Sequence, residues 1–251
     1  MLKPATCDTR KRARLWGEAM PGVQFDKESI LAGHLLLRHL RREELRGLAA
    51  TATLANYPRG KVIFQKDDPG DSMMAVIRGR VKICAHSADG KELVLNLIDR
   101  GGLFGEIALL DGRPRTADAV ALEETDLLVL SRNRFLPFLA ANPEVTNRLF
   151  SVLCQRLRQT SEHLEDALFL EAPSRLARGL LRLAEAFGKP APNGLRIDIK
   201  LSQQQIGSLV GISRESINKH LGEWSQAGYV SVRSGIITIH DRDALDGIAA
   251  A

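Results

Sequence analysis

The spacing of apolar residues changes along the chain, and each pattern predicts a different kind of element. Leucines at helical spacing predict short helices over residues 27–51. Between Leu54 and Leu130, short runs of Val, Ile and Leu are separated by glycines, a pattern typical of a compact all-β sandwich or barrel. The expected strands are KVIFQ, MMAVIRG, RVKICA, ELVLNLI and DLLVLS. We expect the intervening glycines to supply positive φ at the turns, namely Gly60, Gly70, Gly79, Gly90, Gly101 and Gly102.

Residues 143–170 are predicted to form one long helix, with Pro143 in its first turn. One set of positions along it recurs at alternating intervals of four and three residues: Thr146, Phe150, Leu153, Leu157, Thr160, Leu164 and Ala167. A mean spacing of 3.5 residues is the seam of a coiled coil, so we expect this helix to pair with its twin in a homodimer. Packing of the helix on its own β domain is the alternative.

The segment after Pro173 has a different pattern. It begins with an amphipathic helix at 174–187 and a loop at 189–194, and it continues as LSQQQIGSLVGISRESINKHLGEWSQAGYV and a hairpin, VSVRSGIITIH. Ser202 and Ser213 can each cap a helix, and Gly211 lies at the turn between them. Two capped helices with a shared apolar face, followed by a hairpin, are the pattern of a winged helix-turn-helix.

In a helix-turn-helix, the first residues of the second helix enter the DNA major groove. Arginine and lysine suit guanine edges and a carboxylate suits cytosine, whereas contacts from the first helix position the protein on phosphates. The predicted DNA contacts are Ser202, Gln203, Gln204, Ser213, Arg214, Glu215, Asn218 and Lys219. A solvated helix face, or helices that bind another protein, are the alternatives.

Composition and charge limit the partners and the compartment that the chain can have. The 251 residues carry a net charge of +5, concentrated in residues 1–25 and 172–251, which permits a nucleic-acid partner without requiring one. No apolar run approaches the roughly 20 residues of a membrane span, and residues 1–25 lack the pattern of a secretory signal. The three cysteines, Cys7, Cys84 and Cys154, are too far apart for a disulfide framework or a metal spacing, which favours a reducing cytoplasm.

The stretch GEIALLDGRPRT, residues 105–116, places a carboxylate, Glu106, at the entrance to an apolar turn and Arg115 at its exit. Two interpretations compete. The two side chains could form a buried ion pair that fixes a loop, or they could line a pocket for a ligand that is both anionic and hydroxylated.

Three stretches resemble the cyclic-AMP receptor protein/FNR family of bacterial transcription regulators: FGEIALLDGRPRTADAV (104–120), RLRQTSEHL (156–164) and IGSLVGISRESINKHL (206–221). The resemblance covers residues ~30–240. It implies an α+β chain with a β-roll of the cyclic-nucleotide-binding jelly-roll type, 26–142, which the basic residues 1–25 precede as an extension. A long dimerisation helix, 143–171, and a winged helix-turn-helix, 172–251, follow.

The resemblance also assigns a ligand site. By this resemblance, Arg115 and Thr116 bind the cyclic phosphate together with the amides of Ile107 and Ala108. Glu106 accepts a hydrogen bond from the ribose 2′-hydroxyl. Gly105 permits close backbone approach. Arg156 is the partner of Glu106, and Thr160 and Ser161 contact the base from both subunits. The implied ligand is cAMP, with cGMP, or no nucleotide at all, as alternatives.

The predicted protein is therefore not an enzyme. It is a cytoplasmic bacterial regulator that binds a palindromic DNA operator as a homodimer, with RNA polymerase as a further partner and no membrane. Lys219 stands where the best-known family members carry arginine. An iron–sulfur cluster is not expected, because Cys7 is the one N-terminal cysteine. Neither metal nor haem is expected, because His34, His39, His86 and His163 share no spacing, and a cupin-type metalloenzyme would need more than the roll's single His86.

Overall fold

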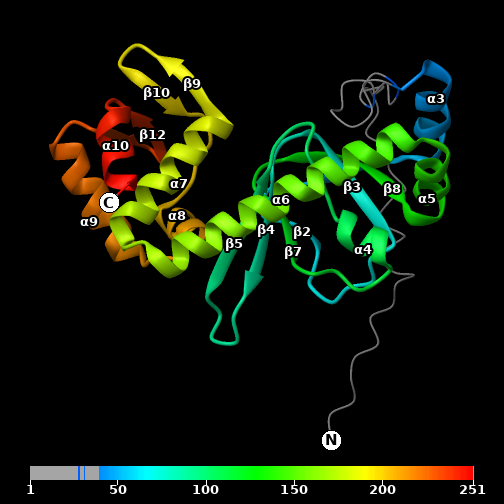
Figure 1. The fold of residues 1–251 in the computed structure, drawn as a ribbon, viewed down its shortest axis with the longest axis horizontal. Coiled ribbons are helices and arrows are strands. Elements are labelled where there is room, and N and C mark those ends of the chain that lie inside the picture. The colour runs from blue at the N-terminus through cyan, green and yellow to red at the C-terminus, as the bar shows by residue number, and fades with distance from the viewer. Residues whose placement is uncertain (1–27, 29–30, 32–39, 251) are drawn as a thin grey trace, which may run out of the picture.

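The computed structural model describes residues 28, 31 and 40–250. The predicted extension at 1–25 and most of the helical segment at 27–39 lie outside them. A β lobe and a smaller C-terminal lobe are joined by one long helix that spans both (Figure 1). The chain thus has the mixed α and β architecture that the sequence predicts. Among the described residues, none of the helices is both long enough and apolar enough to cross a bilayer.

The β lobe is a roll of two four-stranded antiparallel sheets, in the orders β1-β8-β3-β6 and β2-β7-β4-β5. The strands are β1 (Thr53–Tyr57), β2 (Val62–Phe64), β3 (Ser72–Arg78), β4 (Val81–His86), β5 (Glu92–Ile98), β6 (Leu103–Phe104), β7 (Asp118–Ala121) and β8 (Thr125–Ser131). Side chains from both sheets form the core between them, including Phe64, Val81, Phe104 and Leu127. The five predicted strands are confirmed as β2, β3, β4, β5 and β8, and β1, β6 and β7 are additional.

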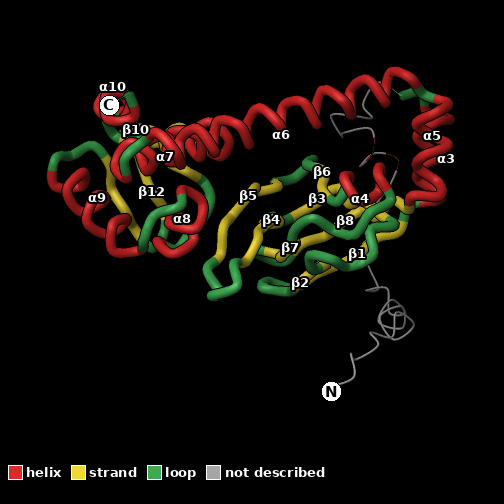
Figure 2. Tube along the Cα trace, turned by 60° about the horizontal axis from the view of Figure 1, so that its bottom comes forward, coloured by secondary structure: helices red, strands yellow, loops and turns green. Residues whose placement is uncertain are grey.

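Three helices cover the roll beside the first sheet: α3 (Arg42–Thr51), α5 (Arg132–Ala141) and the start of α6 (Pro143–Phe169). Their apolar faces meet the outward side chains of β3 and β8 in a second core, which includes Leu48, Met73, Leu128 and Phe135. Figure 2 shows α6 lying along the roll and continuing beyond it to the C-terminal lobe. The long helix is thereby fixed to the roll at its N-terminal end.

Beyond its first turns, α6 presents large apolar side chains to solvent in the single chain. Phe150, Leu157 and Leu164 are 58%, 68% and 60% exposed, and they recur every seven residues as the predicted seam requires. Thr146, the first position of the predicted seam, is half-buried, and its Oγ1 donates to Leu139 O of α5 at 2.9 Å. The exposed seam therefore begins at Phe150, one turn later than the spacing suggests.

The C-terminal lobe contains α7 (Ala172–Phe187), β9 (Gly188–Ala191), β10 (Gly194–Ile197), α8 (Gln203–Val210), α9 (Arg214–Gln226), β11 (Val230–Arg233), β12 (Ile236–Ile239) and α10 (Arg242–Ala249). The prediction of a loop over 189–194 is wrong, since Lys189 and Pro190 lie in a strand that pairs with β10. Proline is tolerated there because β9 is an edge strand of the order β11-β12-β10-β9, where a missing N–H breaks no ladder.

The turn glycines follow two different rules. Gly60, Gly79, Gly90 and Gly101 have positive φ as expected. Gly70 and Gly102 do not, and there the expectation is wrong. Position 70 requires a glycine for a different reason. A Cβ there would lie 2.1 Å from Ala108 Cβ, so α4 (Glu106–Asp111) leaves no room for a side chain.

Candidate functional site

The cassette at 104–116 begins where β6 ends. Gly105 adopts φ 78° and N-caps α4, and a Cβ on it would lie 2.7 Å from Arg115 Nη1. Only glycine combines this left-handed backbone with so close an approach. The turn aims Glu106 inward as the first residue of α4, and Arg115 returns to the same place ten residues after Gly105.

Arg115 is 4% exposed and forms hydrogen bonds with neutral oxygens. Nη1 donates to Gly105 O at 2.8 Å and Nη2 donates to Ser72 Oγ at 3.1 Å, while the guanidinium lies 4.3 Å above the Phe64 ring. Within the described part of the chain, its buried Nε has no hydrogen-bond partner. Burial lowers the pKa of Arg115 from its ordinary value, and the nearby acids act in the opposite direction. The guanidinium still carries its charge at neutral pH.

Glu106 is 2% exposed and pairs with an arginine of the long helix, not with Arg115. Arg156 Nη1 donates to Glu106 Oε1, and Arg156 Nη2 donates to Leu103 O. The pairing that the family resemblance implied is therefore present, and the interpretation of Glu106 and Arg115 as a structural ion pair is wrong. One buried carboxylate ties the cassette to α6 across 50 positions of sequence.

The other predicted ligand residues lie around this centre. Thr116 is exposed, Ile107 is half-exposed, and Ala108 is buried. Thr160 and Ser161 are exposed on α6 one turn beyond Arg156, and their hydroxyls donate to Arg156 O and Leu157 O at 2.9 and 3.1 Å. The single chain thus brings Gly105, Glu106, Arg115 and Arg156 together, and leaves the two helix hydroxyls facing away from its own core.

Helices α8 and α9 of the C-terminal lobe are capped as predicted. Ser202 Oγ accepts from Gln205 N at 3.1 Å while Gln205 Oε1 accepts from Ser202 N at 2.8 Å, which is a complete capping box. Gly211 ends α8 with φ 70°, and Ser213 Oγ accepts from Ser216 N at 3.1 Å to begin α9. A Cβ on Gly207 would lie 2.6 Å from Ile212 O, which explains the glycine inside α8.

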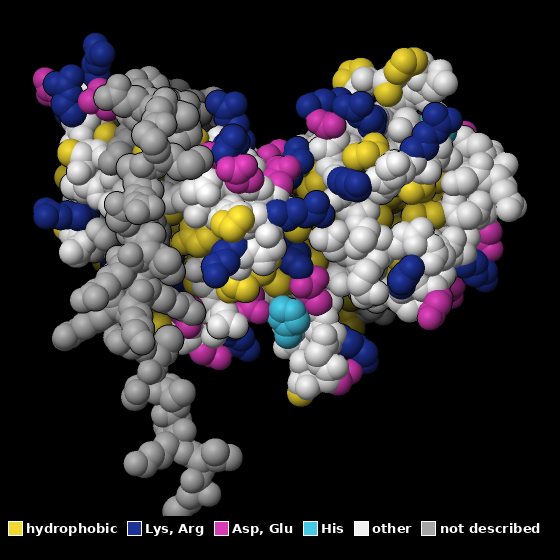
Figure 3. All heavy atoms as spheres, turned by 180° about the vertical axis from the view of Figure 1, so that it is seen from behind, with side chains coloured by type: hydrophobic (Ala, Val, Ile, Leu, Met, Phe, Trp, Pro, Cys, Tyr) yellow, Lys and Arg dark blue, Asp and Glu magenta, His cyan; other side chains and the backbone are white. Residues whose placement is uncertain are grey.

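The outer face of α9 is free of core contacts. Arg214, Glu215, Asn218 and Lys219 are exposed, whereas Ile217, Leu221 and Trp224 on the opposite face are buried. Ser202, Gln204 and Ser213 are exposed, and Gln203 is half-buried. On the face shown in Figure 3, basic and acidic side chains are interspersed, in keeping with the mild net charge. Readout of base edges would depend on the placement of individual side chains on α9, because contacts to phosphates carry no sequence information.

Sequence reasoning missed the joint between the long helix and the C-terminal lobe. Asp166 of α6 is buried and accepts from Arg178 Nη1 at 2.8 Å and from Arg182 Nη2, both on α7. Arg178 Nε also donates to Ala249 O at the end of α10. The sequence carries only a weak signal for this joint. Asp166 lies near the end of one predicted helix, and Arg178 and Arg182 lie four residues apart on the next.

A second contact joins the lobes directly. Strand β5 packs against α8, with Leu97 and Leu122 of the roll against the apolar core of the C-terminal lobe. The Arg80 guanidinium also lies 5.8 Å from the centre of the Phe187 ring. The helix that precedes the recognition helix therefore rests on the β4–β5 hairpin of the roll.

Comparisons with known proteins match both lobes. Residues 54–142 match the cyclic nucleotide-binding domain and residues 174–248 match the Crp-like helix-turn-helix domain. The chain is 32% identical over 218 residues to a CRP-like cAMP-activated global transcriptional regulator of Mycobacterium tuberculosis, covering 87% of this chain and 97% of that protein. It is 34% identical over 193 residues to a cyclic AMP receptor protein of Thermus thermophilus, covering 77% and 86%.

Among solved structures, the c-di-GMP responsive global regulator CLP of Xanthomonas campestris is similar with a TM-score of 0.68. The two chains are 25% identical, and the match covers 80% of this chain and 99% of that one.

Proposed function

This chain belongs to the cyclic-AMP receptor protein/FNR family of transcription regulators, and on that premise we propose that it is a homodimer that binds cAMP and then a palindromic DNA operator. The family consists of regulators and not enzymes, and the chain carries both a cyclic nucleotide-binding domain and a DNA-binding helix-turn-helix.

The observation that carries the nucleotide proposal is the buried Arg115 guanidinium, held by two neutral oxygens and left with an unbonded Nε. A 3′,5′-cyclic phosphate has one negative charge, and a fixed planar guanidinium can donate to it with paired N–H groups. Thr116 supplies a further hydroxyl donor, and the amides of Ile107 and Ala108 add donors at the first turn of α4.

Glu106 discriminates the sugar. Its Oε1 is engaged by Arg156, so the second carboxylate oxygen can accept the ribose 2′-hydroxyl that a 3′,5′-cyclic phosphate leaves free. The relatives' names favour cAMP, because the M. tuberculosis protein is described as cAMP-activated and the T. thermophilus protein as a cyclic AMP receptor. The X. campestris regulator is described as c-di-GMP responsive, so a guanine nucleotide, cGMP included, is the alternative to test.

The exposed seam of α6 supports the homodimer. Burying one leucine side chain from water is worth about 1.5–3 kcal/mol, and each chain offers Phe150, Leu157 and Leu164 on one line. Pairing of two such helices would also bring Thr160 of one chain and Ser161 of the other to the same nucleotide. In the proposal these hydroxyls rotate away from their own helix carbonyls and bond to the base, one from each chain.

A twofold dimer presents two copies of α9, which suits two half-sites one helical turn apart. Arg214 and Lys219 would read base edges with Glu215 and Asn218, while Ser202, Gln203, Gln204 and Ser213 would lie at the phosphate backbone. A regulator of this kind acts on bacterial DNA in the cytoplasm, and RNA polymerase is the partner through which it would act on transcription.

The test is a calorimetric titration of the full chain with cAMP, cGMP and c-di-GMP, for the wild type and for Arg115→Leu. Loss of a charge-assisted bidentate contact is worth about 2–3 kcal/mol, so the variant should bind cAMP roughly 30- to 150-fold more weakly. The matched control is Arg113→Leu, which removes an exposed guanidinium from the same loop. Circular dichroism checks that each variant keeps the wild-type fold.

Binding of cAMP to Arg115→Leu within about threefold of the wild type would place the pocket elsewhere. Binding of a different nucleotide by the wild type would leave the site but change the ligand. Selection from a random operator library, with and without the nucleotide, then tests the DNA part. Recovery of no palindromic sequence would contradict that part and would favour a protein partner for the C-terminal helices.

A further inference from the structure

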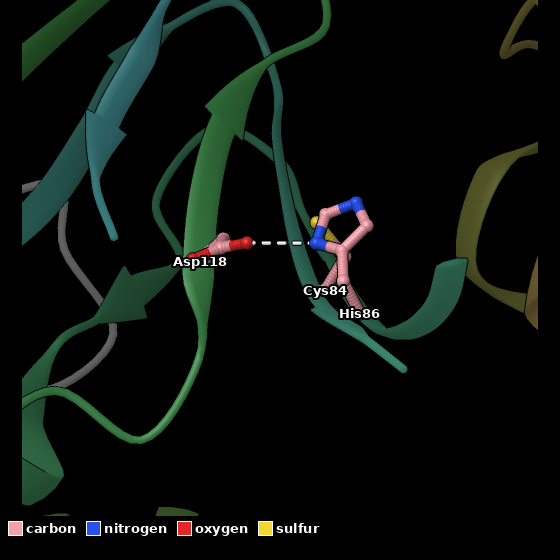
Figure 4. Close-up of side chains that lie close together, drawn as sticks. All are labelled: Cys84, His86 and Asp118. Atoms are coloured by element: carbon pink, nitrogen blue, oxygen red, sulfur yellow. Dashed lines mark hydrogen bonds and ion pairs between the residues drawn. The ribbon is translucent and has the colours of Figure 1, made fainter. Parts of the chain in front are cut away.

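Three side chains with metal-binding chemistry meet on the second sheet of the roll, away from the cassette contacts. Cys84 and His86 lie two residues apart on β4, and Asp118 begins β7, whose pairing sets it directly opposite Cys84. One potential ligand atom from each residue lies within 4.8 Å of the other two. Figure 4 shows the imidazole directed at the carboxylate, with the sulfur behind the ring on the side that faces Asp118.

We propose that Cys84, His86 and Asp118 form a binding site for a divalent transition-metal ion of the zinc class. Thiolate, imidazole and carboxylate are the ligands that zinc prefers, and three of them leave one position for water or a further ligand. The thiolate and the carboxylate together neutralise the ion's charge, while the imidazole binds as a neutral group. Binding releases the thiol proton to solvent as the sulfur–metal bond forms.

The geometry needs little adjustment. His86 Nδ1 and Asp118 Oδ2 are 2.8 Å apart, and metal–nitrogen and metal–oxygen bonds of about 2.0–2.2 Å at a tetrahedral angle require a separation of roughly 3.3–3.5 Å. The nitrogen–oxygen distance would thus open by roughly 0.5–0.7 Å to admit an ion, while the sulfur closes from within 4.8 Å. Such a movement is within the reach of a side-chain rotation on strands whose backbones stay paired.

The surroundings hold the ligands in place and leave an entrance. Asp118 Oδ1 accepts from Lys66 N at 2.7 Å, a second contact that orients the carboxylate as metal sites require. Cys84 is buried, whereas the His86 side chain is 46% exposed, so an ion can enter from solvent on the imidazole side. Glu92 faces the other ring nitrogen of His86, with its Oε2 at 3.6 Å, and is itself paired with Lys82.

Occupancy would tie the β4–β5 hairpin to β7. That hairpin matters because β5 packs against α8 of the C-terminal lobe. A metal ion in this position would stiffen the sheet on which the DNA-binding helices rest. From the spacing of residues along the chain alone, no metal is predicted. That spacing could not show Asp118 beside Cys84 and His86, because strand pairing brings it there.

The probe is Co²⁺ added to the full-length chain, because thiolate-to-cobalt charge transfer and tetrahedral d–d absorption report the ligands directly. A Cys7→Ser/Cys154→Ser variant serves as the reference, so that Cys84 is the one cysteine left. We expect one Co²⁺ per chain with a charge-transfer band, displaced by Zn²⁺. Saturating Zn²⁺ should also raise the melting temperature of the reference protein.

In the same background, His86→Gln should weaken Co²⁺ binding at least tenfold and abolish the rise in melting temperature with Zn²⁺. Its side chain is half-exposed, so this variant keeps its fold even if Cys84→Ala does not. The matched control is His220→Gln, a histidine of α9 outside the cluster, which should behave as the reference does. Asp118→Asn should weaken binding as His86→Gln does.

Two results would overturn the proposal. One is Co²⁺ binding without the charge-transfer band, and the other is a Co²⁺ affinity of His86→Gln within threefold of the reference. In either case the Co²⁺ would be bound adventitiously at the surface. Neither result would affect the nucleotide proposal, because the hydrogen bonds of His86 and Asp118 go to groups other than Glu106 and Arg115. Nucleotide titrations of the reference and of His86→Gln in metal-free buffer separate the two sites.

Discussion

Removing Arg156 should cost more stability than any single exposed charge, because it leaves a buried carboxylate without its partner. Arg156→Met keeps most of the aliphatic stem and deletes two donors, one to Glu106 Oε1 and one to Leu103 O. The Glu106 side chain is 3% exposed, so water cannot fully replace the lost contact in the closed structure. The variant also disconnects the cassette from the long helix.

The magnitude follows from the burial of the two partners. Breaking a fully buried ion pair by removing one member costs about 3–5 kcal/mol. Here the Arg156 side chain is 25% exposed, so water can enter the vacated space and soften the loss. We therefore expect the free energy of unfolding of the roll to fall by about 2–3 kcal/mol. Arg158→Met, an exposed arginine of the same helix, should cost less than about 0.5 kcal/mol.

Differential scanning calorimetry is the assay, since a chain with two lobes need not unfold in one step and calorimetry separates the transitions. A double-mutant cycle with Glu106→Gln isolates the pair from other effects of each change. We expect a coupling energy of at least about 1.5 kcal/mol in the nucleotide-free protein. Additive losses would refute the reasoning, because they would mean that the two groups do not stabilise each other in solution.

Three further predictions concern other contacts. Gly70→Ala should lower nucleotide affinity at least tenfold in a calorimetric titration, because the added methyl group would displace α4. The control Gly90→Ala lies at a turn with open space, so it should cost about 1 kcal/mol of stability and leave the nucleotide affinity unchanged. Asp166→Asn should weaken the joint with the C-terminal lobe by about 1–3 kcal/mol, so the two calorimetric transitions should move apart; a single unchanged transition would contradict this role. Arg214→Ala should weaken operator binding by about 1–3 kcal/mol and relax the preference at one base pair per half-site. Gln204→Ala should weaken binding to operator and to scrambled DNA equally in competition assays. Equal losses on both DNAs from both variants would argue against α9 as the reading helix.

Elements whose signals are local could be predicted from the sequence. Ser202, Gly211 and Ser213 each satisfy backbone groups within four residues, so their residue types alone place both ends of the turn between α8 and α9. The five predicted strands were likewise bounded by glycines or polar turns. The prediction of a loop over 189–194 failed, because a proline can lie in an edge strand when its missing N–H would face solvent, and β9 is such a strand.

The candidate site was predictable in its residue types but not in its pairings. From the local pattern alone, Glu106 and Arg115 are the obvious ion pair, and the family resemblance was needed to assign Glu106 to Arg156. No local rule predicts a contact between residues 50 positions apart, because the fold and not the spacing brings them together. The same holds for Cys84 and Asp118, which meet through the register of β4 on β7.

The three nonlocal ion pairs of α6 give the long helix a specific mechanical role. At one end a carboxylate of the roll, Glu106, reaches an arginine of the helix; at the other, a carboxylate of the helix, Asp166, reaches Arg178 and Arg182 of the C-terminal lobe. Both carboxylates are buried, so neither contact can loosen without leaving a charge poorly solvated. A ligand that binds Glu106 would therefore act on the helix through Arg156, and a shift of the helix would act on the C-terminal lobe through Asp166. The exposed apolar seam lies between these two joints, where pairing with a second chain would determine how the helix is able to move.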